Sequence, residues 1–401
     1  MLYHLLYPLH TTLSVFNVFR YITFRTIYAS LTAFFICFLL GPWIIRKLGI
    51  MQVRQYIRDD GPESHLSKAG TPTMGGLLIV FSIVVSTLLW SDLTDYFVWI
   101  MLLVIAGYAL IGFYDDYLMQ IKKHSKGLSV RHKFILQFGL ALVTGYLVYA
   151  SPDFSTQVTI PFFKKLSPDL GWGYIIFAAF VIVGTSNAVN LTDGLDGLAI
   201  GPVIIAAATY MIFAYVAGHI KIANYLQINY VAGSGELAIF CGTLAGAGMG
   251  FLWFNAYPAQ IFMGDVGSST LGFLVAAFSL WASHESIFPL WIAVLIFSPF
   301  IVDATITLIR RLIKGEKIWE AHKSHYYQRL GQLGWGHRRT VLWEYLLMVL
   351  CGISAIAASK MDGSLQLILL IMWIMIYSTL IFYINKLEYR HKNCSSTATR
   401  S

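Results

Sequence analysis

Apolar residues along the chain fall into eleven blocks, separated by short segments rich in Gly, Pro and charged residues. Most blocks are close to the about 18–20 residues that a helix needs to cross a bilayer. Inside lipid a helix satisfies its own backbone hydrogen bonds, so these blocks indicate membrane-spanning helices. The predicted helices lie near residues 22–42, 73–90, 97–114, 133–150, 172–188, 198–217, 237–254, 261–281, 288–309, 341–359 and 365–385.

Composition agrees with this pattern. Hydrophobic residues make up 57% of the chain and charged residues 12%, whereas soluble domains contain about 25% charged residues. The predicted fold class is an all-α polytopic integral membrane protein with about 10–11 transmembrane helices. We interpret residues 1–386 as a single transmembrane domain, followed by a short basic tail at 387–401.

Lys and Arg are unevenly distributed over the connecting segments. If segment 43–72 is cytoplasmic, the cytoplasmic segments and their flanks hold 22 of the 28 Lys and Arg residues. Because basic loops stay in the cytoplasm, the N-terminus is expected outside and the C-terminus inside. The net charge of +8 is then mainly a topological signal, and no nucleic-acid partner is expected. Residues 1–20 lack a basic start and a small-residue cleavage site, so the first span is expected to be retained.

Carboxylates gather at the proposed cytoplasmic ends of the blocks. This arrangement favours a lipid-modifying enzyme over a transporter, which hides charges within its spans. Asp115 and Asp116 follow the third block. Two adjacent carboxylates repel each other, and a hard cation such as Mg²⁺ suits oxygen ligands and would relieve that repulsion. The alternative is a solvated pair of acids at a helix end.

Two further polar clusters lie on the same side. The first occupies residues 187–198. There Asn190, Asp193 and Gly197 are spaced so that a helical turn presents them together; the alternative is an ordinary Gly- and Asp-rich connection. In the second cluster, Asp265 lies just inside an apolar block, where a carboxylate costs about 2.5–3.5 kcal/mol unless a cavity or partner compensates it. Its alternative role is a helix cap.

The connecting segment 310–339 contains several histidines besides its Lys and Arg residues. One interpretation is a phosphate-binding arm that uses His322 and His325; the other is positive-inside charge alone. The histidines favour the first, because topology needs only Lys and Arg. Asp303, within the ninth block, is interpreted as a buried structural partner, for which Arg310 is a candidate.

Three segments together resemble the phospho-N-acetylmuramoyl-pentapeptide-transferase family of polyprenyl-phosphate sugar-1-phosphate transferases. Residues 60–76, which read DGPESH and then KAGTPTMGG from Lys68, look like the family's first signature. Residues 187–198 look like its second signature, and residues 251–265 resemble a third conserved block. The resemblance covers roughly residues 15–280.

The resemblance implies a Mg²⁺-dependent transferase with its active site on the cytoplasmic face of the bacterial inner membrane and its N-terminus in the periplasm. The implied partners are UDP-N-acetylmuramoyl-pentapeptide, undecaprenyl phosphate and membrane lipid, with lipid I and UMP as products of a step in peptidoglycan synthesis. The implied catalytic residues are Asp115, Asp116, Asp265 and His325. The three aspartates are also the implied metal ligands, with Asp265 foremost. The implied substrate-binding residues are Lys68, Thr73, Asn187, Asn190, Asp193, Gly194, Leu195, Asp196, Asn255, Phe262 and His322.

The resemblance implies that the transmembrane domain 1–386 is catalytic, but its part 280–386 is atypical and departs from the family's pattern. The family usually carries three consecutive histidines in its last cytoplasmic loop and ends after a tenth span. Here residues 321–330 read AHKSHYYQRL, and an eleventh block follows. This region looks more like sister enzymes that start O-antigen or other glycans from UDP-N-acetylhexosamines, so transfer of N-acetylhexosamine-1-phosphate is the alternative function. A transporter or non-catalytic scaffold is the third hypothesis.

Two questions stay open at this stage. The first is the order of the reaction. In one mechanism Asp115 or Asp116 removes a proton from the lipid phosphate, which then attacks the sugar-linked phosphorus directly; in the other, a carboxylate attacks first and forms a covalent intermediate. The sequence also leaves the oligomeric state open, a homodimer included.

Overall fold

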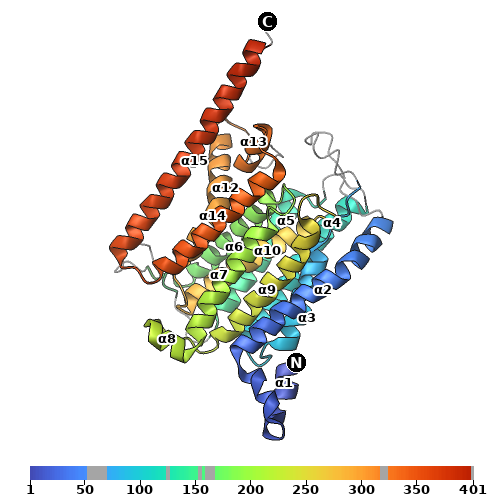
Figure 1. Ribbon diagram of the computed structural model, residues 1–401, viewed down its shortest axis with the longest axis vertical. Coiled ribbons are helices and arrows are strands. Elements are labelled where there is room, and N and C mark those ends of the chain that lie inside the picture. Colours follow the sequence, from blue (N-terminus) through green and yellow to red (C-terminus); the bar gives the residue numbers. More distant parts are fainter. Residues whose placement is uncertain (52–69, 123–126, 152–155, 159–167, 317–323, 399–401) are drawn as a thin grey trace. The chain divides into compact units, whose positions relative to one another are not determined.

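The computed structural model shows an all-helical polytopic membrane protein, as predicted (Figure 1). An isolated antiparallel bridge joins Gln157 and Asp169. Contacts divide the chain into two compact units, the first ending at Leu290 and the second beginning at Trp291. The residues that the structure describes are 1–51, 70–122, 127–151, 156–158, 168–316 and 324–398.

The first unit begins with three short helical segments and continues with nine helices in its described part. The short segments are α1 (Leu2–Leu6), η1 (Tyr7–Thr11) and η2 (Ser14–Arg20). The others are α2 (Ile22–Ile50), α3 (Gly76–Trp90), α4 (Tyr96–Gln120), α5 (Val130–Tyr149), α6 (Gly173–Thr192), α7 (Ile200–Gly218), α8 (Ile220–Leu226), α9 (Ser234–Asn255) and α10 (Gly264–His284). The second unit contains all but the first residue of α11 (Leu290–Ile296), together with α12 (Ser298–Ile313), α13 (Tyr326–Gln332), α14 (His337–Ala358) and α15 (Gly363–Ala398).

Every predicted block corresponds to helical structure, but the ninth block is broken. Its two halves, α11 and α12, meet at an angle of 78°. Pro299 lies in the first turn of α12, where its missing N–H is tolerated, whereas it would interrupt a continuous helix. Among the described residues, eight helices are long and apolar enough to cross a membrane, or nine if the bent pair forms one span.

The interior of the first unit is built from α9 and α10. Over the most apolar 18 residues of each helix, 83% of the residues of α9 and 94% of those of α10 are buried. A helix that is apolar all round must be enclosed by others. The approach of α3 to α10 depends on Gly76, because a Cβ at this position would lie 2.2 Å from the backbone nitrogen of Gly267. The two helices therefore meet backbone to backbone at this point.

The two ends of the first unit are named by the helices that begin there. At the α10 end, α3, α5 and α10 begin, and α4, α6 and α9 end. At the α9 end, α2 and α9 begin and α3 ends, as the ion pair between Arg25 and Glu236 and the contact of Arg25 with the Trp90 carbonyl indicate. The separation is set by α9, whose 22 residues correspond to about 33 Å.

Candidate active site

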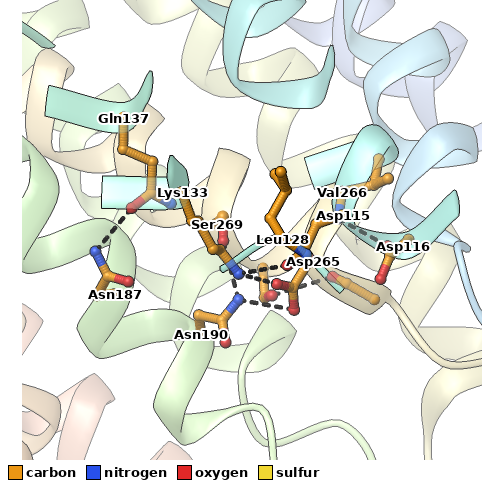
Figure 2. Close-up of polar contacts among 12 residues, drawn as sticks. Asp115, Asp116, Leu128, Lys133, Gln137, Asn187, Asn190, Asp265, Val266 and Ser269 are labelled. Carbon is orange, nitrogen blue, oxygen red and sulfur yellow. Dashed lines mark hydrogen bonds and ion pairs between the residues drawn. The ribbon is translucent and has the colours of Figure 1, made fainter. Parts of the chain in front are cut away.

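Side chains from four helices meet at the α10 end around Asp265. The Nζ atom of Lys133, in the first turn of α5, lies 2.9 Å from Oδ2 of Asp115 near the end of α4. The same Nζ atom also contacts Oδ2 of Asp265. Figure 2 shows the lysine side chain pointing between the two carboxylates. One ammonium group therefore joins two acids that are 150 residues apart in sequence.

Asn190 holds the other oxygen of Asp265. Its Nδ2 atom donates to Oδ1 of Asp265 at 3.0 Å and to Oγ of Ser269 at 2.9 Å. Asn190 lies in the last turn of α6, so the end of α6 is fixed on the first turns of α10 (Figure 2). Contacts on both carboxylate oxygens restrict the rotation of Asp265, while its side chain remains 21% exposed.

The other two aspartates are more deeply buried. Asp115 and Asp116 are 4% and 2% exposed. Oδ1 of Asp115 accepts from the backbone N–H of Leu128 at 2.7 Å, and Oδ2 of Asp116 accepts from the N–H of Val266 at 3.1 Å. Asp116 thus binds an otherwise unpaired amide in the first turn of α10. Of the three carboxylates, Asp265 is the one most accessible to a ligand.

The segment before α3 runs beside the segment before α10. The backbone N–H of Gly75 donates to the carbonyl of Phe262 at 2.9 Å, and the N–H of Phe262 donates to the carbonyl of Pro72 at 2.9 Å. This pairing places Thr73, which is 4% exposed, beside Gly264. Gly264 has φ +72°, and a Cβ there would lie 2.6 Å from Oδ2 of Asp116. A larger residue at position 264 would therefore push against the acidic cluster.

A second polar group connects the segment after α6 with the segment after α9. Oδ1 of Asn255 accepts from the N–H of Gly197 at 3.1 Å, and its Nδ2 donates to the carbonyl of Ile261 at 2.9 Å. Oδ2 of Asp196 accepts from the N–H of Ala259 at 3.1 Å. Asp196 and Asn255 are buried, and through these hydrogen bonds both hold the backbone of the two segments in place.

The remaining predicted residues have distinct surroundings. Asp193, Gly194 and Leu195 are partly exposed and lie between the end of α6 and the buried Asp196. Nδ2 of Asn187 donates to Oε1 of Gln137 at 3.1 Å, which ties α6 to α5 (Figure 2). The predicted residues Lys68 and His322 lie outside the described residues.

His325 belongs to the second unit. It precedes α13, is 2% exposed, and its Nδ1 lies 3.5 Å from Oδ1 of Asp303. The same Asp303 oxygen accepts from the backbone N–H of Tyr326 at 2.9 Å and contacts the Thr307 hydroxyl at 3.2 Å. Among the described residues, Asp303 therefore pairs with the segment around α13 and not with Arg310, the candidate partner from the sequence.

Sequence reasoning did not select Lys133, although it is the central contact of the cluster. A signal was present: Lys133 begins the fourth apolar block on the side where the acids gather. That signal is weak, because the positive-inside tendency places Lys residues in the same position. Ser269 and Gln137 were also not selected, since a hydroxyl or an amide inside an apolar block carries no topological information.

The cluster has the ligand chemistry for a divalent cation. Two carboxylates, Asp115 and Asp265, share one ammonium group in a largely buried site, which leaves one negative charge in excess. The described residues contain no group of three or more His, Cys, Asp or Glu side chains arranged to hold a metal. Mg²⁺ is commonly held by one or two carboxylates together with waters and substrate phosphates. Asp265 and Asp115 fit that mode of binding.

Comparisons with known proteins give a consistent result. The family model described as glycosyl transferase family 4 matches residues 98–283, and the model of phospho-N-acetylmuramoyl-pentapeptide-transferase signature 1 matches residues 68–80. The first match contains the aspartate cluster, Lys133 and Asn190. The second contains Thr73 and the segment that pairs with Phe262.

Similar proteins bear the name phospho-N-acetylmuramoyl-pentapeptide-transferase. One from Desulforapulum autotrophicum is 52% identical over 364 residues, which cover 90% of this chain and 99% of the relative. One from Desulfosudis oleivorans is 53% identical with the same coverage of both chains. One from Syntrophus aciditrophicus is 52% identical over 361 residues, covering 90% of this chain and all of the relative.

Proposed function

The chain belongs to the phospho-N-acetylmuramoyl-pentapeptide-transferase family, and from this premise we propose that it transfers phospho-N-acetylmuramoyl-pentapeptide from its UDP derivative to undecaprenyl phosphate. The reaction forms lipid I and releases UMP. The observation that carries the proposal is the cluster in which Lys133 joins Asp115 and Asp265 at one end of the helices. This is where a membrane-bound lipid phosphate and a soluble nucleotide sugar can meet.

Phosphoryl transfer depends mainly on positioning and on stabilising negative charge. Asp265 is suited to the first task, because Lys133 and Asn190 fix its two oxygens. Lys133 is suited to the second, because its ammonium group lies between carboxylates and presents positive charge beside the incoming phosphates. Neither side chain needs to reorganise much before it acts.

Mg²⁺ is proposed as the cofactor, with Asp265 as its main ligand and Asp115 as the second. When bound, Mg²⁺ stabilises the charge on the diphosphate and on the departing nucleotide. Asp116 is less suited to this role, because its Oδ2 accepts the backbone N–H of Val266 and it does not share Lys133 with Asp265 as Asp115 does. Its proposed role is to hold the start of α10 in place.

The proton of the lipid phosphate is proposed to go to Asp115 rather than to Asp116. Asp115 shares Lys133 with Asp265, so it lies on the side of the cluster that faces the proposed phosphates. A covalent intermediate on a carboxylate is the alternative order of events. Rapid quenching of an enzyme–nucleotide-sugar mixture without lipid, followed by mass spectrometry of the protein, separates the two: a protein adduct supports the covalent order.

The membrane and its orientation follow from the same proposal. The multi-pass character is plain from the helices. The bacterial inner membrane, with the α10 end facing the cytoplasm, is supported by the concentration of Lys and Arg on that side. The roles of Lys68, His322 and His325 in substrate binding or catalysis stay predictions from the family resemblance.

The experiment that tests the proposed function is transfer by the purified protein in detergent, with Mg²⁺ and undecaprenyl phosphate. UDP-N-acetylmuramoyl-pentapeptide and UDP-N-acetylglucosamine are offered in parallel. We expect lipid-linked product from the muramoyl substrate alone. Product from the N-acetylhexosamine alone would assign the chain to the sister reaction, and no product from folded protein with either substrate would contradict the enzyme assignment.

A further inference from the structure

The first turns of α5 carry Lys133 but are only loosely packed. Every residue from Val130 to Leu136 is at least partly exposed, and Gln137, at 1% exposure, is the first buried residue of the helix. Gln137 follows Lys133 by four residues, so the two lie on one face of α5, one turn apart. The position of Lys133 therefore depends on how Gln137 is held.

The side chain of Gln137 is bound to α6. Its Oε1 accepts from Nδ2 of Asn187 at 3.1 Å (Figure 2). The same Nδ2 donates to the carbonyl of Val183 at 2.8 Å, which fixes the orientation of the Asn187 amide. Asn187 precedes Asn190 by three residues, so both lie on one face of α6. The contact with Gln137 thus ties α5 to α6 one turn away from the Asp265 cluster.

The backbone of Gln137 is bound to α4. Its carbonyl accepts from the hydroxyl of Tyr108 at 2.9 Å. Tyr108 is fully buried, and its ring packs against that of Phe273 in α10, with the ring centroids 3.8 Å apart. A hydroxyl in such surroundings needs a hydrogen-bond partner. Gln137 therefore joins α5 to α4 and to α6 at one level of the helices.

Two levels of polar contacts thus connect the same helices. At the α10 end, the charged level contains Lys133, Asp265 and Asn190, and it is partly exposed. The level of Gln137 lies deeper, is uncharged, and its central residue is closed to solvent. Neutral buried contacts keep their partners when a phosphate or a cation changes the charges beside them. The deeper level is therefore suited to hold the charged level in place.

We propose that Gln137 is a positioning residue that sets where the ammonium group of Lys133 lies relative to the carboxylates of the cluster. Asn187 and Tyr108 hold Gln137, and none of the three needs to touch the substrate. The effect passes through Lys133. The inference rests on the proposed function, in which Lys133 stabilises negative charge during transfer. A displacement of about 1 Å in a site of this kind lowers a rate by about 10²-fold at most.

The first test replaces Gln137 by methionine, which has a similar length and no amide. We expect Gln137→Met to lower kcat about tenfold, with KM for UDP-N-acetylmuramoyl-pentapeptide changed less than about twofold, because a misplaced charge acts mainly in the transition state. The matched control is Tyr210→Phe, which removes a buried hydrogen bond of 2.8 Å between α7 and α10, to Ser279. Its kcat should stay within about twofold of the wild type.

A double-mutant cycle separates the positioning of Lys133 from a general loss of structure. In the Lys133→Met background, Gln137→Met should lower kcat by less than about twofold further, because no ammonium group remains to be positioned. Tyr108→Phe is a milder variant of the same level, with an expected loss of about threefold that also disappears in this background. A wild-type kcat in Gln137→Met would overturn the proposal. So would a loss that is repeated in full without Lys133.

Amide hydrogen exchange gives a readout that is independent of activity. On the full-length protein, we expect Gln137→Met to accelerate exchange at residues 133–136 about tenfold, whereas Tyr210→Phe should leave it unchanged. Unchanged exchange in Gln137→Met would overturn the anchoring of α5 by Gln137. A wild-type protein that forms no muramoyl product would instead overturn the proposed function, and the exchange data would still decide whether Gln137 holds the start of α5.

Discussion

The first unit contains two clusters of opposite charges, one at each end of its helices, and they differ in how they are satisfied. At the α9 end, Nη1 of Arg25 lies 2.6 Å from Oε1 of Glu236, and the two side chains are 7% and 8% exposed. The other oxygen of Glu236 accepts from the N–H of Asp92 at 2.8 Å. At the α10 end, one lysine contacts two carboxylates, and the side chains of Asp265 and Lys133 are 21% and 19% exposed.

We take this difference to separate a structural ion pair from the cluster that we propose takes part in the reaction. The pair of Arg25 and Glu236 has one charge of each sign and is packed beneath the ring of Tyr3, whose centroid lies 4.5 Å from Cζ of Arg25. The cluster around Asp265 has an excess of carboxylates and remains partly open. A charged ligand can bind where side chains of the opposite charge are in excess and remain accessible. A buried ion pair that stabilises a fold instead needs one charge of each sign and no access to solvent.

The largest expected effect is on Asp265. We predict that Asp265→Asn lowers the transfer rate by about 10³-fold or more, because it removes the carboxylate proposed as the main Mg²⁺ ligand and weakens the contact with Lys133. The unfolding midpoint should change little. Both are measured at equal concentrations of folded protein, with Asp169→Asn, an exposed carboxylate outside the cluster, as the control. A transfer rate close to that of the wild type would show that Asp265 does not act in the reaction.

The reverse result is expected at the α9 end. We predict that Glu236→Ala destabilises the protein by about 3–5 kcal/mol, because it leaves the buried Arg25 without a partner. The transfer rate per folded molecule should stay close to that of the wild type. Denaturant or thermal unfolding in detergent measures the first effect. Replacement of both residues, Arg25→Met with Glu236→Met, should recover much of the lost stability. If folded Glu236→Ala lost its transfer activity, the ion pair at the α9 end would not be purely structural.

The next effect concerns the lysine that sequence reasoning did not select. We predict that Lys133→Met lowers the transfer rate by about 10²-fold, since it removes the positive charge from between two carboxylates. Lys122→Met, at an exposed lysine just after α4, should leave the rate unchanged. Equal effects of the two substitutions would mean that general surface charge, and not the contact with Asp115 and Asp265, is what matters.

The smallest expected effect concerns the close contact between the backbones of α3 and α10. We predict that Gly76→Ala costs about 1–3 kcal/mol of stability, because the new methyl group would lie 2.2 Å from the backbone of Gly267. Gly139→Ala in α5 is the matched control, since a Cβ there meets no atom within 4 Å. The control should be neutral or slightly stabilising, because Ala favours a helix. Equal unfolding midpoints of the two variants would show that α3 can move away from α10 at little cost.

Much of the architecture could be predicted from the sequence, because length and hydropathy are local properties. The blocks locate the helices, and the side on which the acids fall brings Asp115 and Asp265 to one end. The break between α11 and α12 was not predicted, although Pro299 was visible as a signal. A proline in an apolar block permits a kink, a break or a helix start, and the neighbouring helices decide among them.

The pairing of distant charges could not be predicted in the same way. Lys133 and Asp265 are 132 residues apart, and their contact requires α5 and α10 to begin side by side. Likewise, no sequence pattern linked Arg25 to Glu236, which are 211 residues apart. Such contacts depend on which helices pack together, and one sequence alone does not contain that information.

The central claim is that this chain transfers a phospho-sugar to a lipid phosphate, and the identity of the released nucleotide tests it most directly. Purified protein is incubated with Mg²⁺, undecaprenyl phosphate and UDP-N-acetylmuramoyl-pentapeptide, and the nucleotide and lipid products are quantified by mass spectrometry. We predict UMP in equal amount to a lipid that has gained phospho-N-acetylmuramoyl-pentapeptide. Release of UDP would contradict the claim, because it would mean that the sugar moved without its phosphate.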